Sequence, residues 1–362
     1  MGSNAATVAV IGGGVMGLAT AWELTRRGHR PVVLEQFSRG HAHGASHGAT
    51  RNFNNAYQDE HYLDLLVRAR HGWDALGSPG GEPLLRLHGL VSHGDVDIAS
   101  VRGRLAERGI PAEILDAAEA RRRWPGMRFE DAVLWSSDAG VVRASAALLE
   151  LERRIVEAGG EVRWETPVRD IVEDASGVAL ALPDGTLHTD TVVVAAGAWT
   201  ARLLGGIRLP RLRVTEETPA HFAPRSASDA IWPSFNHYVD TDRFPATVYG
   251  MPTPGEGVKV GFHGVGDEVD PDARPHRTTH ADVLAAYVRE WMPGLDASSA
   301  APISCTYTST DDDTFILDRR GRIVVGAGFS GHGFKFATGV GAVLADLALD
   351  AGARAAEPFR LR

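Results

Sequence analysis

The stretch Thr7-Val-Ala-Val-Ile-Gly12-Gly-Gly-Val-Met-Gly17 decides the fold of this chain. Its apolar first half is typical of a short buried strand. The segment after it carries Leu18 and Trp22 on one helical face and predicts a helix that stops near Gly28. The run Pro31-Val-Val-Leu-Glu35 then predicts a second strand. A strand, a helix and a strand in so few residues form a βαβ unit.

The glycines of this unit have the spacing G-x-G-x-x-G of a dinucleotide-binding turn. Gly12 and Gly14 permit a tight turn that approaches a pyrophosphate, and Gly17 lets the helix pack closely on the strand. The helix N-terminus offers amide donors to phosphate oxygens. Glu35, at the end of the second strand, is placed to accept hydrogen bonds from ribose hydroxyls. A glycine-rich turn that binds nothing is the alternative, and the motif does not separate FAD from NAD.

The rest of the chain predicts an α/β fold of two domains, in an α+β arrangement. A Rossmann-like nucleotide domain is expected to be discontinuous, because buried-strand runs return at 191–196 and 322–326 and helical patterns at 61–76, 148–155 and 339–349. Residues 215–305 carry short strands, aromatics and prolines, which predict a mainly antiparallel sheet. We assign residues 1–86, 143–212 and 309–362 to the nucleotide domain, and 87–142 and 213–308 to a substrate-binding catalytic domain.

Composition excludes several classes of protein. The chain of 362 residues is 44% hydrophobic and 23% charged, as globular proteins are, and no window approaches eighteen consecutive apolar residues. A net charge of −9 without a basic cluster argues against a nucleic-acid surface. A single cysteine forbids an intramolecular disulfide, and no export signal is recognisable, so we expect a cytoplasmic protein.

Three histidines, His41, His43 and His47, stand close together in the sequence. No carboxylate or cysteine cluster accompanies them, and small residues separate them. We therefore expect no metal site.

Four further motifs indicate a family. They are Gly44-Ala-Ser-His-Gly-Ala-Thr-Arg51, Arg123-Trp-Pro-Gly126, Ala196-Gly-Ala-Trp199 and Gly328-Phe-Ser-Gly-His-Gly-Phe-Lys-Phe336. With the amino-terminal βαβ unit, they resemble the monomeric sarcosine oxidase and N-methyltryptophan oxidase family of FAD-dependent amine oxidases, over essentially the whole chain. The resemblance implies FAD as cofactor, a small-molecule amine and O₂ as substrates, hydrogen peroxide as a product, and a monomer without nucleic-acid or membrane partners.

The resemblance also implies which residues contact FAD. Cys305 is similar to the cysteine that the family joins through sulfur to the 8α carbon of the flavin, whereas a lone cysteine is otherwise most often a small buried hydrophobe. A helix that begins near Thr338 is expected to point its N-terminus at the flavin C2 carbonyl. The full cofactor set is Gly12, Gly14, Gly17, Glu35, His47, Thr50, Arg51, Val168, Gly197, Trp199, Cys305, Gly331, His332, Gly333 and Lys335.

Four residues are similar to the family's catalytic positions. Lys259 matches a lysine that faces the flavin and acts on O₂, and His263, four positions on in a predicted strand, lies on the same face. Arg51 would stabilise negative charge on the reduced flavin, and Lys335 matches the lysine that reaches a substrate carboxylate. The substrate pocket is expected to contain Asn54, Glu216, Tyr249, His263, Tyr307, Gly331 and Lys335.

Two positions depart from the family pattern. Asn54 stands where the family has a second arginine for the substrate carboxylate, and an amide cannot make that bidentate pair. Glu216 stands where these oxidases tend to have a neutral glutamine. We therefore expect an oxidase of a secondary or primary amine, or of an N-alkyl amino acid, with a natural substrate other than sarcosine. An FAD dehydrogenase that passes electrons to a carrier and a non-catalytic nucleotide-binding protein are the alternatives.

Overall fold

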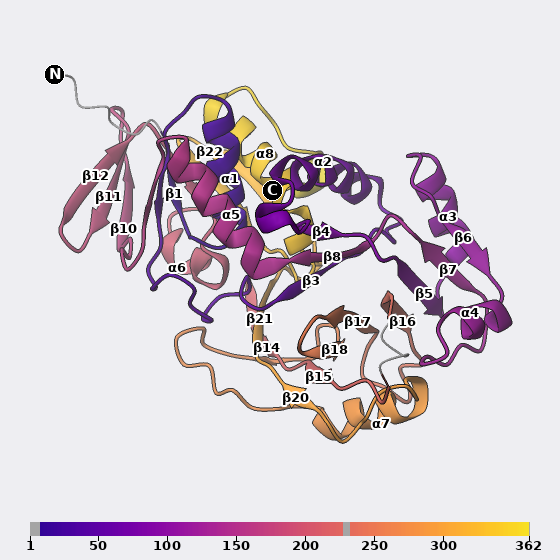
Figure 1. Ribbon diagram of the computed structural model, residues 1–362. Coiled ribbons are helices and arrows are strands. Elements are labelled where there is room, and N and C mark those ends of the chain that lie inside the picture. Colours follow the sequence, from indigo (N-terminus) through magenta and orange to yellow (C-terminus); the bar gives the residue numbers. More distant parts are fainter. Residues whose placement is uncertain (1–7, 227–231, 362) are drawn as a thin grey trace.

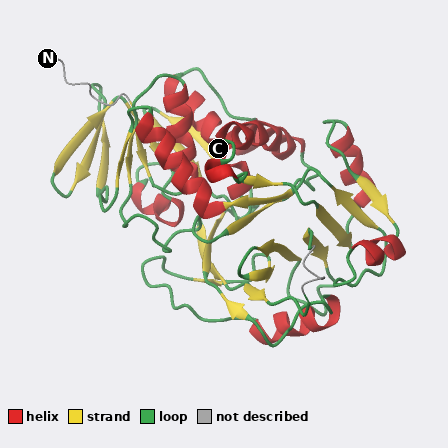
Figure 2. Ribbon diagram, in the orientation of Figure 1, coloured by secondary structure: helices red, strands yellow, loops and turns green. Residues whose placement is uncertain are grey.

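The computed structural model describes residues 8–226 and 232–361, and these form two large sheets with smaller sheets between and beside them (Figures 1 and 2). The first large sheet carries the βαβ unit. Its order is β22-β23-β13-β1-β2-β9, in which all neighbours are parallel except β22 and β23. Its strands are β1 (Val8–Ile11), β2 (Val32–Leu34), β9 (Glu161–Arg163), β13 (Thr191–Val194), β22 (Ile316–Arg320) and β23 (Ile323–Ala327).

Helices cover one face of this parallel sheet. α1 (Val15–Arg26) packs mainly on α8 (Ala337–Leu349) and α5 (Ala144–Glu157), and α2 (Glu60–Leu76) packs on the other side of α8. α8 is rich in small residues, so neighbouring backbones approach it closely: a Cβ at Gly341 would lie 2.6 Å from the carbonyl carbon of Ala19 in α1. Side chains of these helices and of the sheet form one apolar core.

A three-stranded antiparallel sheet lies at the far end of the nucleotide sheet. It consists of β10 (Asp170–Glu173), β11 (Val178–Leu182) and β12 (Gly185–Thr189), and it packs through Val178, Leu180 and Leu182 on the opposite face of the parallel sheet. The short helix α6 (Thr200–Leu203) follows the 3-10 turn η2 (Gly197–Trp199) after β13.

The second large sheet has eight strands in the order β20-β15-β18-β17-β16-β5-β7-β6. All its neighbours are antiparallel except β16 and β5. Its strands are β5 (Leu90–Gly94), β6 (Glu113–Leu115), β7 (Val133–Ser136), β15 (Ala220–Phe222), β16 (Ser234–Tyr238), β17 (Val248–Thr253), β18 (Gly257–Phe262) and β20 (Ala301–Pro302). The helices α3 (Ile98–Ala106), α4 (Ala117–Arg123) and α7 (Ala281–Trp291) surround it (Figure 1).

Two small sheets join the two halves. One consists of β3 (Thr50–Phe53), β8 (Gly140–Arg143) and β4 (Leu85–Arg86), and the other of β19 (Asp267–Glu268), β14 (Arg213–Glu217) and β21 (Cys305–Ser309). The short 3-10 turns η1 (Pro79–Gly81), η4 (Phe334–Phe336) and η5 (Glu357–Phe359) complete the described elements. Because β3 and β21 carry Arg51 and Cys305, these joining sheets bring residues of both halves to one place.

The α/β fold class expected from the sequence is confirmed, with a nucleotide sheet assembled from the start, middle and end of the chain. Every strand of the parallel sheet falls in the three segments assigned to the nucleotide domain, and every strand of the eight-stranded sheet in the other two. β8 crosses the expected boundary at residues 142–143, so the domain limits themselves stay a prediction.

Some elements differ from the expectations. The expected hairpin at 178–188 is part of a three-stranded sheet, because β10 adds to its edge. The eight-stranded sheet recruits β5, β6 and β7 from the earlier segment, and β5 lies parallel to β16 within it. The first strand was expected from Thr7, which lies outside the described residues.

Candidate active site

One cavity of about 1460 Å³ runs from the glycine-rich turn to the eight-stranded sheet. Ordinary small-molecule pockets span about 300–1,000 Å³, so this space suits a larger ligand such as a dinucleotide. Residues of the parallel sheet, of both joining sheets and of β16, β17 and β18 line it. The cavity therefore lies between the two halves of the molecule.

The glycine-rich turn at one end is built for close approach. Gly12 has a φ of +110°, and a Cβ there would lie 2.4 Å from the carbonyl oxygen of Ala195. At Gly17, a Cβ would lie 1.9 Å from the carbonyl oxygen of Gly12, so only glycine lets α1 pack against the turn. Gly14 is the N-cap of α1 and has no side chain that could satisfy the first amides. The Val15 amide donates to the Ser46 hydroxyl at 3.0 Å, and the remaining amides of this first turn point their partial positive charge toward a phosphate.

Glu35 holds the turn as well as facing the cavity. Its carboxylate accepts hydrogen bonds from the amide of Gly13 at 2.7 Å and from the amide of Phe37 at 2.9 Å. Each oxygen keeps a second lone pair that can accept a ribose hydroxyl. Val168, Gly197 and Trp199 lie in the same part of the wall. This end of the cavity fits the adenosine half of FAD.

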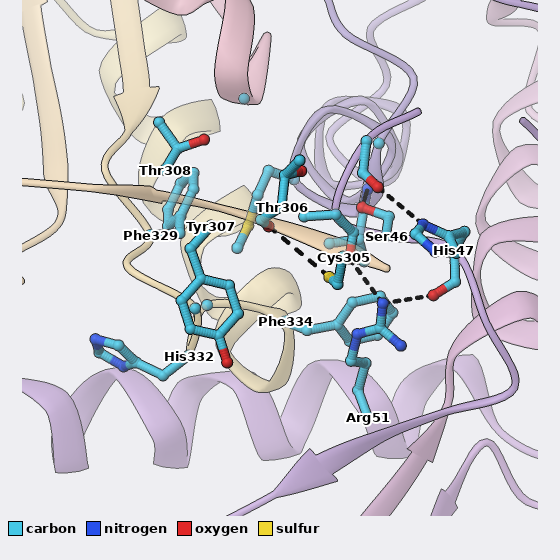
Figure 3. A pocket seen from close by; sticks show the side chains of 18 of the residues that line it. Ser46, His47, Arg51, Cys305, Thr306, Tyr307, Thr308, Phe329, His332 and Phe334 are labelled. Carbon is cyan, nitrogen blue, oxygen red and sulfur yellow. Dashed lines mark hydrogen bonds between the residues drawn. The ribbon is translucent and has the colours of Figure 1, made fainter. Parts of the chain in front are cut away.

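The middle of the cavity contains the cysteine and the basic loop. Cys305 is partly exposed at the start of β21 and lines the wall. Figure 3 shows it between His47 and Arg51 on one side and Tyr307 and His332 on the other. The His47 ring connects the two segments, because Nδ1 lies 2.8 Å from the carbonyl oxygen of Gly44 and Nε2 lies 3.1 Å from that of Ser304. Burial and the nearby Arg51 charge lower the pKa of His47.

The Arg51 guanidinium is hydrogen-bonded to backbone carbonyl groups. It donates to the carbonyl oxygens of Thr50, Ala45 and His47 at 2.9, 2.8 and 2.5 Å. It also lies 5.7 Å from the ring centroid of Phe334. Arg51 therefore folds the loop 44–51 around itself and keeps a full positive charge on the cavity wall.

Lys259 projects into the cavity from β18. Its side chain is 4% exposed, and its ammonium donates to the carbonyl oxygen of Thr50 at 3.4 Å. Burial, with the Arg51 charge second, lowers the pKa of Lys259 to about 7. A cation in such a dry position interacts strongly with negative charge that develops near it.

Lys335 lines the same cavity from η4. It is 5% exposed, and its ammonium donates to the phenol oxygen of Tyr57 at 2.9 Å and to the carbonyl oxygen of His332 at 2.6 Å. Burial lowers the pKa of Lys335 to about 7. Gly331 and Gly333 share this wall, and a Cβ at Gly331 would lie 2.0 Å from the Tyr307 ring.

Aromatic side chains and His263 line the cavity near Lys335. The Tyr307 hydroxyl lies 3.4 Å from Nδ1 of His263, and the Tyr249 ring meets His263 edge-on with centroids 6.4 Å apart. Burial, with the Lys335 charge second, lowers the pKa of His263. β18 ends at Phe262, so His263 follows the strand instead of lying in it, but it faces the same cavity as Lys259.

Three predicted residues lie outside the wall that the described residues form. Gly17 packs directly against the backbone of Gly12. Thr50 contributes to the site through its carbonyl oxygen, which accepts a hydrogen bond from the Lys259 ammonium. Glu216 is buried on β14, where its carboxylate accepts from the Ser304 hydroxyl and lies 3.8 Å from the Arg274 guanidinium. Ser304 and Arg274 themselves line the cavity, so Glu216 contacts the wall from its outer side. Asn54 does line the cavity, and its side chain accepts from the amide of Ala56 at 2.7 Å.

Sequence reasoning missed several residues of the wall. Tyr57 binds Lys335, and His221, Glu256, Arg274 and Asn236 also face the cavity. The alternation of strand β15 could have indicated His221, because it faces the same way as its cross-strand neighbour Lys259. No local pattern distinguishes Tyr57 from any other tyrosine.

In residues 8–226 and 232–361, no group of three or more histidine, cysteine, aspartate or glutamate side chains could hold a metal ion. No helix among those described is long and apolar enough to cross a bilayer.

Comparison with known proteins agrees with this geometry. The chain matches the FAD dependent oxidoreductase family, DAO, over residues 7–347. It is 33% identical to the monomeric sarcosine oxidase of Streptomyces avermitilis, with 94% of this chain and 93% of the relative aligned. It is 30% identical to the N-methyl-L-tryptophan oxidase of Salmonella heidelberg, with 94% of each chain aligned.

A solved structure extends this likeness to three dimensions. NikD, described as an unusual amino acid oxidase essential for nikkomycin biosynthesis, superposes with a TM-score of 0.84 at 26% identity, and the match covers 97% of this chain and 95% of NikD. The likeness in sequence and in fold thus extends over nearly the whole chain. It includes the glycine-rich turn, both joining sheets and the elements that carry Lys259 and Lys335. With a cavity that fits FAD and relatives that oxidise amines and amino acids, the chain belongs to the FAD-dependent oxidoreductase family and is an enzyme of the sarcosine oxidase type.

Proposed function

We propose that this enzyme is an oxidase of a secondary or primary amine, or of an N-alkyl amino acid, and that it uses O₂ as electron acceptor. The observation that carries the proposal is the pair of buried lysines, Lys259 and Lys335, on the wall of one cavity that fits FAD. Bound FAD would take a hydride equivalent from the carbon next to the amine nitrogen, leaving an imine that water hydrolyses, and would return the electrons to O₂ as hydrogen peroxide.

The cations of the wall favour substrate in its neutral amine form. Lys259, Lys335 and Arg51 all face the cavity, and like charges at short range repel in a dry site. A neutral amine also keeps the lone pair that assists loss of hydride. His263 is held neutral by burial and by the Lys335 charge, so it can accept or donate a hydrogen bond to substrate without adding charge. Turnover should therefore increase with pH as the substrate loses its proton.

Each cation has a separate proposed role. Lys259 stabilises the negative charge that forms when O₂ takes its first electron. Lys335 binds a substrate carboxylate where the substrate has one, because it lies at the aromatic end with Tyr249, Tyr307 and His263. Arg51 stabilises negative charge on the reduced cofactor while it holds the loop 44–51 in place.

We also propose that FAD is covalently attached through Cys305. The thiol is partly exposed on the wall between the basic loop and Tyr307, where a flavin would pass from the glycine-rich turn to the lysines. The His47 ring binds the carbonyl oxygen of Ser304, the residue before Cys305, and so holds the backbone beside the thiol. A buried structural cysteine would instead be packed among apolar side chains.

The substrate is proposed to be larger than sarcosine or to lack a carboxylate. Asn54 on the wall cannot pair with a carboxylate as an arginine would, and its side-chain oxygen accepts a hydrogen bond from the backbone amide of Ala56. Glu216 adds nothing to this argument, because its carboxylate is bound by Ser304 and Arg274 and does not line the cavity. Lys335 is then the cation that holds a carboxylate at this end.

The cell compartment and assembly state complete the proposal. We propose a cytoplasmic monomer, because the one cysteine is assigned to the cofactor and a homologous enzyme is named monomeric sarcosine oxidase.

A screen of purified enzyme against secondary and primary amines, with peroxide detected by a coupled peroxidase, tests the function. Peroxide release in proportion to amine consumed supports the oxidase. A dehydrogenase would give a different result: an amine would bleach the flavin, air would not restore its colour, and an artificial electron carrier would. A colourless polypeptide that refuses added FAD would refute both.

A further inference from the structure

Lys259 has two ionisable neighbours that the proposed chemistry has not used. His221 on β15 and Lys259 on β18 are directly paired across the antiparallel ladder, so their side chains lie on the same face of the sheet. Both line the cavity, together with Glu256 from the turn between β17 and β18. Nε2 of His221 lies 3.3 Å from the Glu256 carboxylate.

The three side chains differ in their access to water. Lys259 is almost fully buried, the His221 side chain is 7% exposed, and the Glu256 side chain is 48% exposed. They therefore form a row from the dry part of the cavity to the protein surface. Among the described residues, Nε2 of His221 has no aligned hydrogen-bond partner and is sealed from water. Buried polar atoms are normally paired, and a small rotation of the half-exposed Glu256 would supply the partner.

The charges around Lys259 are consistent with a role in moving protons. The buried position and Arg51 on β3 disfavour the ammonium, whereas the Glu256 carboxylate favours it. His221 is kept neutral by burial and by the Lys259 charge, with Glu256 acting in the opposite direction. A neutral imidazole between an ammonium and a carboxylate can accept a proton from one side and donate it to the other.

Reduction of O₂ requires protons as well as electrons. Hydrogen peroxide forms from O₂ with two electrons and two protons, and the hydride equivalent removed from the amine supplies both electrons and one proton. The second proton must come from the protein or from water. Lys259 is a buried ammonium on this part of the wall, and it must be charged again before the next turnover.

We propose that Glu256 and His221 are a proton path from solvent to Lys259, which replaces the proton that Lys259 gives up as O₂ becomes hydrogen peroxide. Water protonates Glu256, Glu256 passes the proton to His221, and His221 passes it to the neutral amine of Lys259. The inference rests on the proposed oxidase function. Glu256 and His221 are positioning residues in it, since they act through Lys259.

The first test measures the ionisation of Lys259 in the resting holoenzyme. The flavin absorbance is titrated with pH, and Lys259→Met identifies the step that belongs to Lys259. Loss of the Glu256 charge in Glu256→Gln should lower the midpoint of this step by about half a pH unit or more. Asp184→Asn, which removes an exposed carboxylate from the β11–β12 turn, is the matched control and should leave the midpoint unchanged. An unchanged midpoint in Glu256→Gln would overturn the inference.

The second test follows proton delivery. Enzyme that has been reduced by amine without air is mixed rapidly with O₂, and flavin reoxidation is recorded above pH 8. Glu256→Gln and His221→Ala should slow this phase at least about tenfold, as expected for a lost proton-transfer group. Added imidazole should restore the rate in His221→Ala. Amine-dependent reduction, measured separately, should stay within about twofold of wild type.

The outcomes separate this inference from the oxidase proposal. A slow phase that imidazole does not restore indicates a structural role and overturns the proton path, while the oxidase stands. Reoxidation rates equal to wild type in both variants would also overturn the proton path and leave the oxidase proposal standing. If the reduced wild-type enzyme does not react with O₂ at all, the oxidase itself is refuted.

Discussion

The ammonium of Lys335 lies 2.9 Å from the phenol oxygen of Tyr57, although the two residues are 278 positions apart in the chain. Tyr57 accepts this hydrogen bond, and its oxygen lies 3.2 Å from Nδ1 of His332. The Tyr57 ring stacks on Tyr62, with centroids 5.7 Å apart, and the lysine lies 5.4 Å from the Tyr57 ring centroid. The proposed carboxylate-binding cation is therefore oriented by an aromatic side chain that carries no sequence motif.

Replacement of this tyrosine should weaken binding of substrates that have a carboxylate. Tyr57→Phe removes the acceptor and leaves a buried ammonium with one partner fewer, so we expect KM for an N-alkyl amino acid to rise about tenfold with kcat within about threefold. Steady-state kinetics on an amino acid and on an amine without a carboxylate provide the measurement. Tyr62→Phe, whose hydroxyl donates to the Asp313 carbonyl instead, is the control. Equal effects on both substrates would contradict the role.

Replacing Asn54 with the arginine that the family has at this position should strengthen the binding of substrates that have a carboxylate. Asn54→Arg places a second cation on the wall near Lys335, and a bidentate pair with carboxylate is among the strongest hydrogen-bonded contacts. KM for sarcosine should fall about tenfold or more, and the amine without a carboxylate should gain nothing. Asn54→Gln controls for the longer side chain. A wild-type enzyme that already uses sarcosine with a low millimolar KM would refute the substrate proposal.

The two buried lysines give the apoprotein a defined pH dependence of stability. Their folded pKa values near 7 are below the ordinary value of 10.5, so the unfolded chain binds more protons between these limits. The free energy of unfolding should therefore increase as pH rises from about 7 to 9, by up to about 1.4 kcal/mol per pH unit for each lysine. Above pH 10 the buried tyrosines, whose pKa values are raised, oppose this trend.

Urea unfolding of apoprotein at several pH values measures this slope. Lys335→Met and Lys259→Met should each reduce it, and the double variant should be nearly flat. A wild-type stability that does not change between pH 7 and 9 would show that the lysines stay charged in the folded apoprotein.

Removal of the thiol tests the covalent link directly. Wild-type protein precipitated by acid should keep its yellow colour in the pellet, whereas Cys305→Ser should release FAD to the supernatant. Absorbance of both fractions gives the amount attached. Because the serine hydroxyl is nearly isosteric, FAD should still bind to the variant reversibly. A colourless wild-type pellet with free FAD in the supernatant would disprove attachment.

Two helix glycines form a matched pair for the nucleotide turn. A Cβ at Gly17 in α1 would lie 1.9 Å from the Gly12 carbonyl oxygen, whereas a Cβ at Gly103 in α3 would meet nothing within 4 Å. Gly17→Ala should push α1 from the turn and reduce FAD binding at least about a hundredfold. Gly103→Ala should bind FAD normally and unfold with about 0.5–1 kcal/mol more free energy, since alanine favours the helix. Flavin fluorescence quenching and urea unfolding measure the two effects.

The sequence predicted what local pattern and motif determine. The glycine spacing, the buried-strand runs and the helical periodicity identified the βαβ unit and the return of the chain to the same sheet at β13 and β23. The resemblance placed Cys305, Lys259, His263 and Lys335 in one pocket, and in the structure all four line one cavity.

Other contacts depend on packing between distant segments. Glu216 was expected in the substrate pocket because of its position in the sequence, but its carboxylate lies outside the cavity, bound to Arg274 and Ser304 of the wall. Tyr57 and Glu256 belong to no sequence motif. Their proposed roles depend on contacts with residues far away in the chain, Lys335 and His221. The parallel pairing of β5 with β16 joins segments more than a hundred residues apart, for which no local signal exists.

The order of strands in the parallel sheet has a consequence for how the enzyme is made. β1 leaves the ribosome first, but its neighbour β13 is synthesised more than 180 residues later, and β23 and α8 come from the last 40 residues. Because α8 covers α1 and carries the Lys335 segment before it, the flavin pocket can close only after α8 has been synthesised. A shorter nascent chain should thus present an open β1 edge to chaperones, and cofactor capture must follow the synthesis of α8.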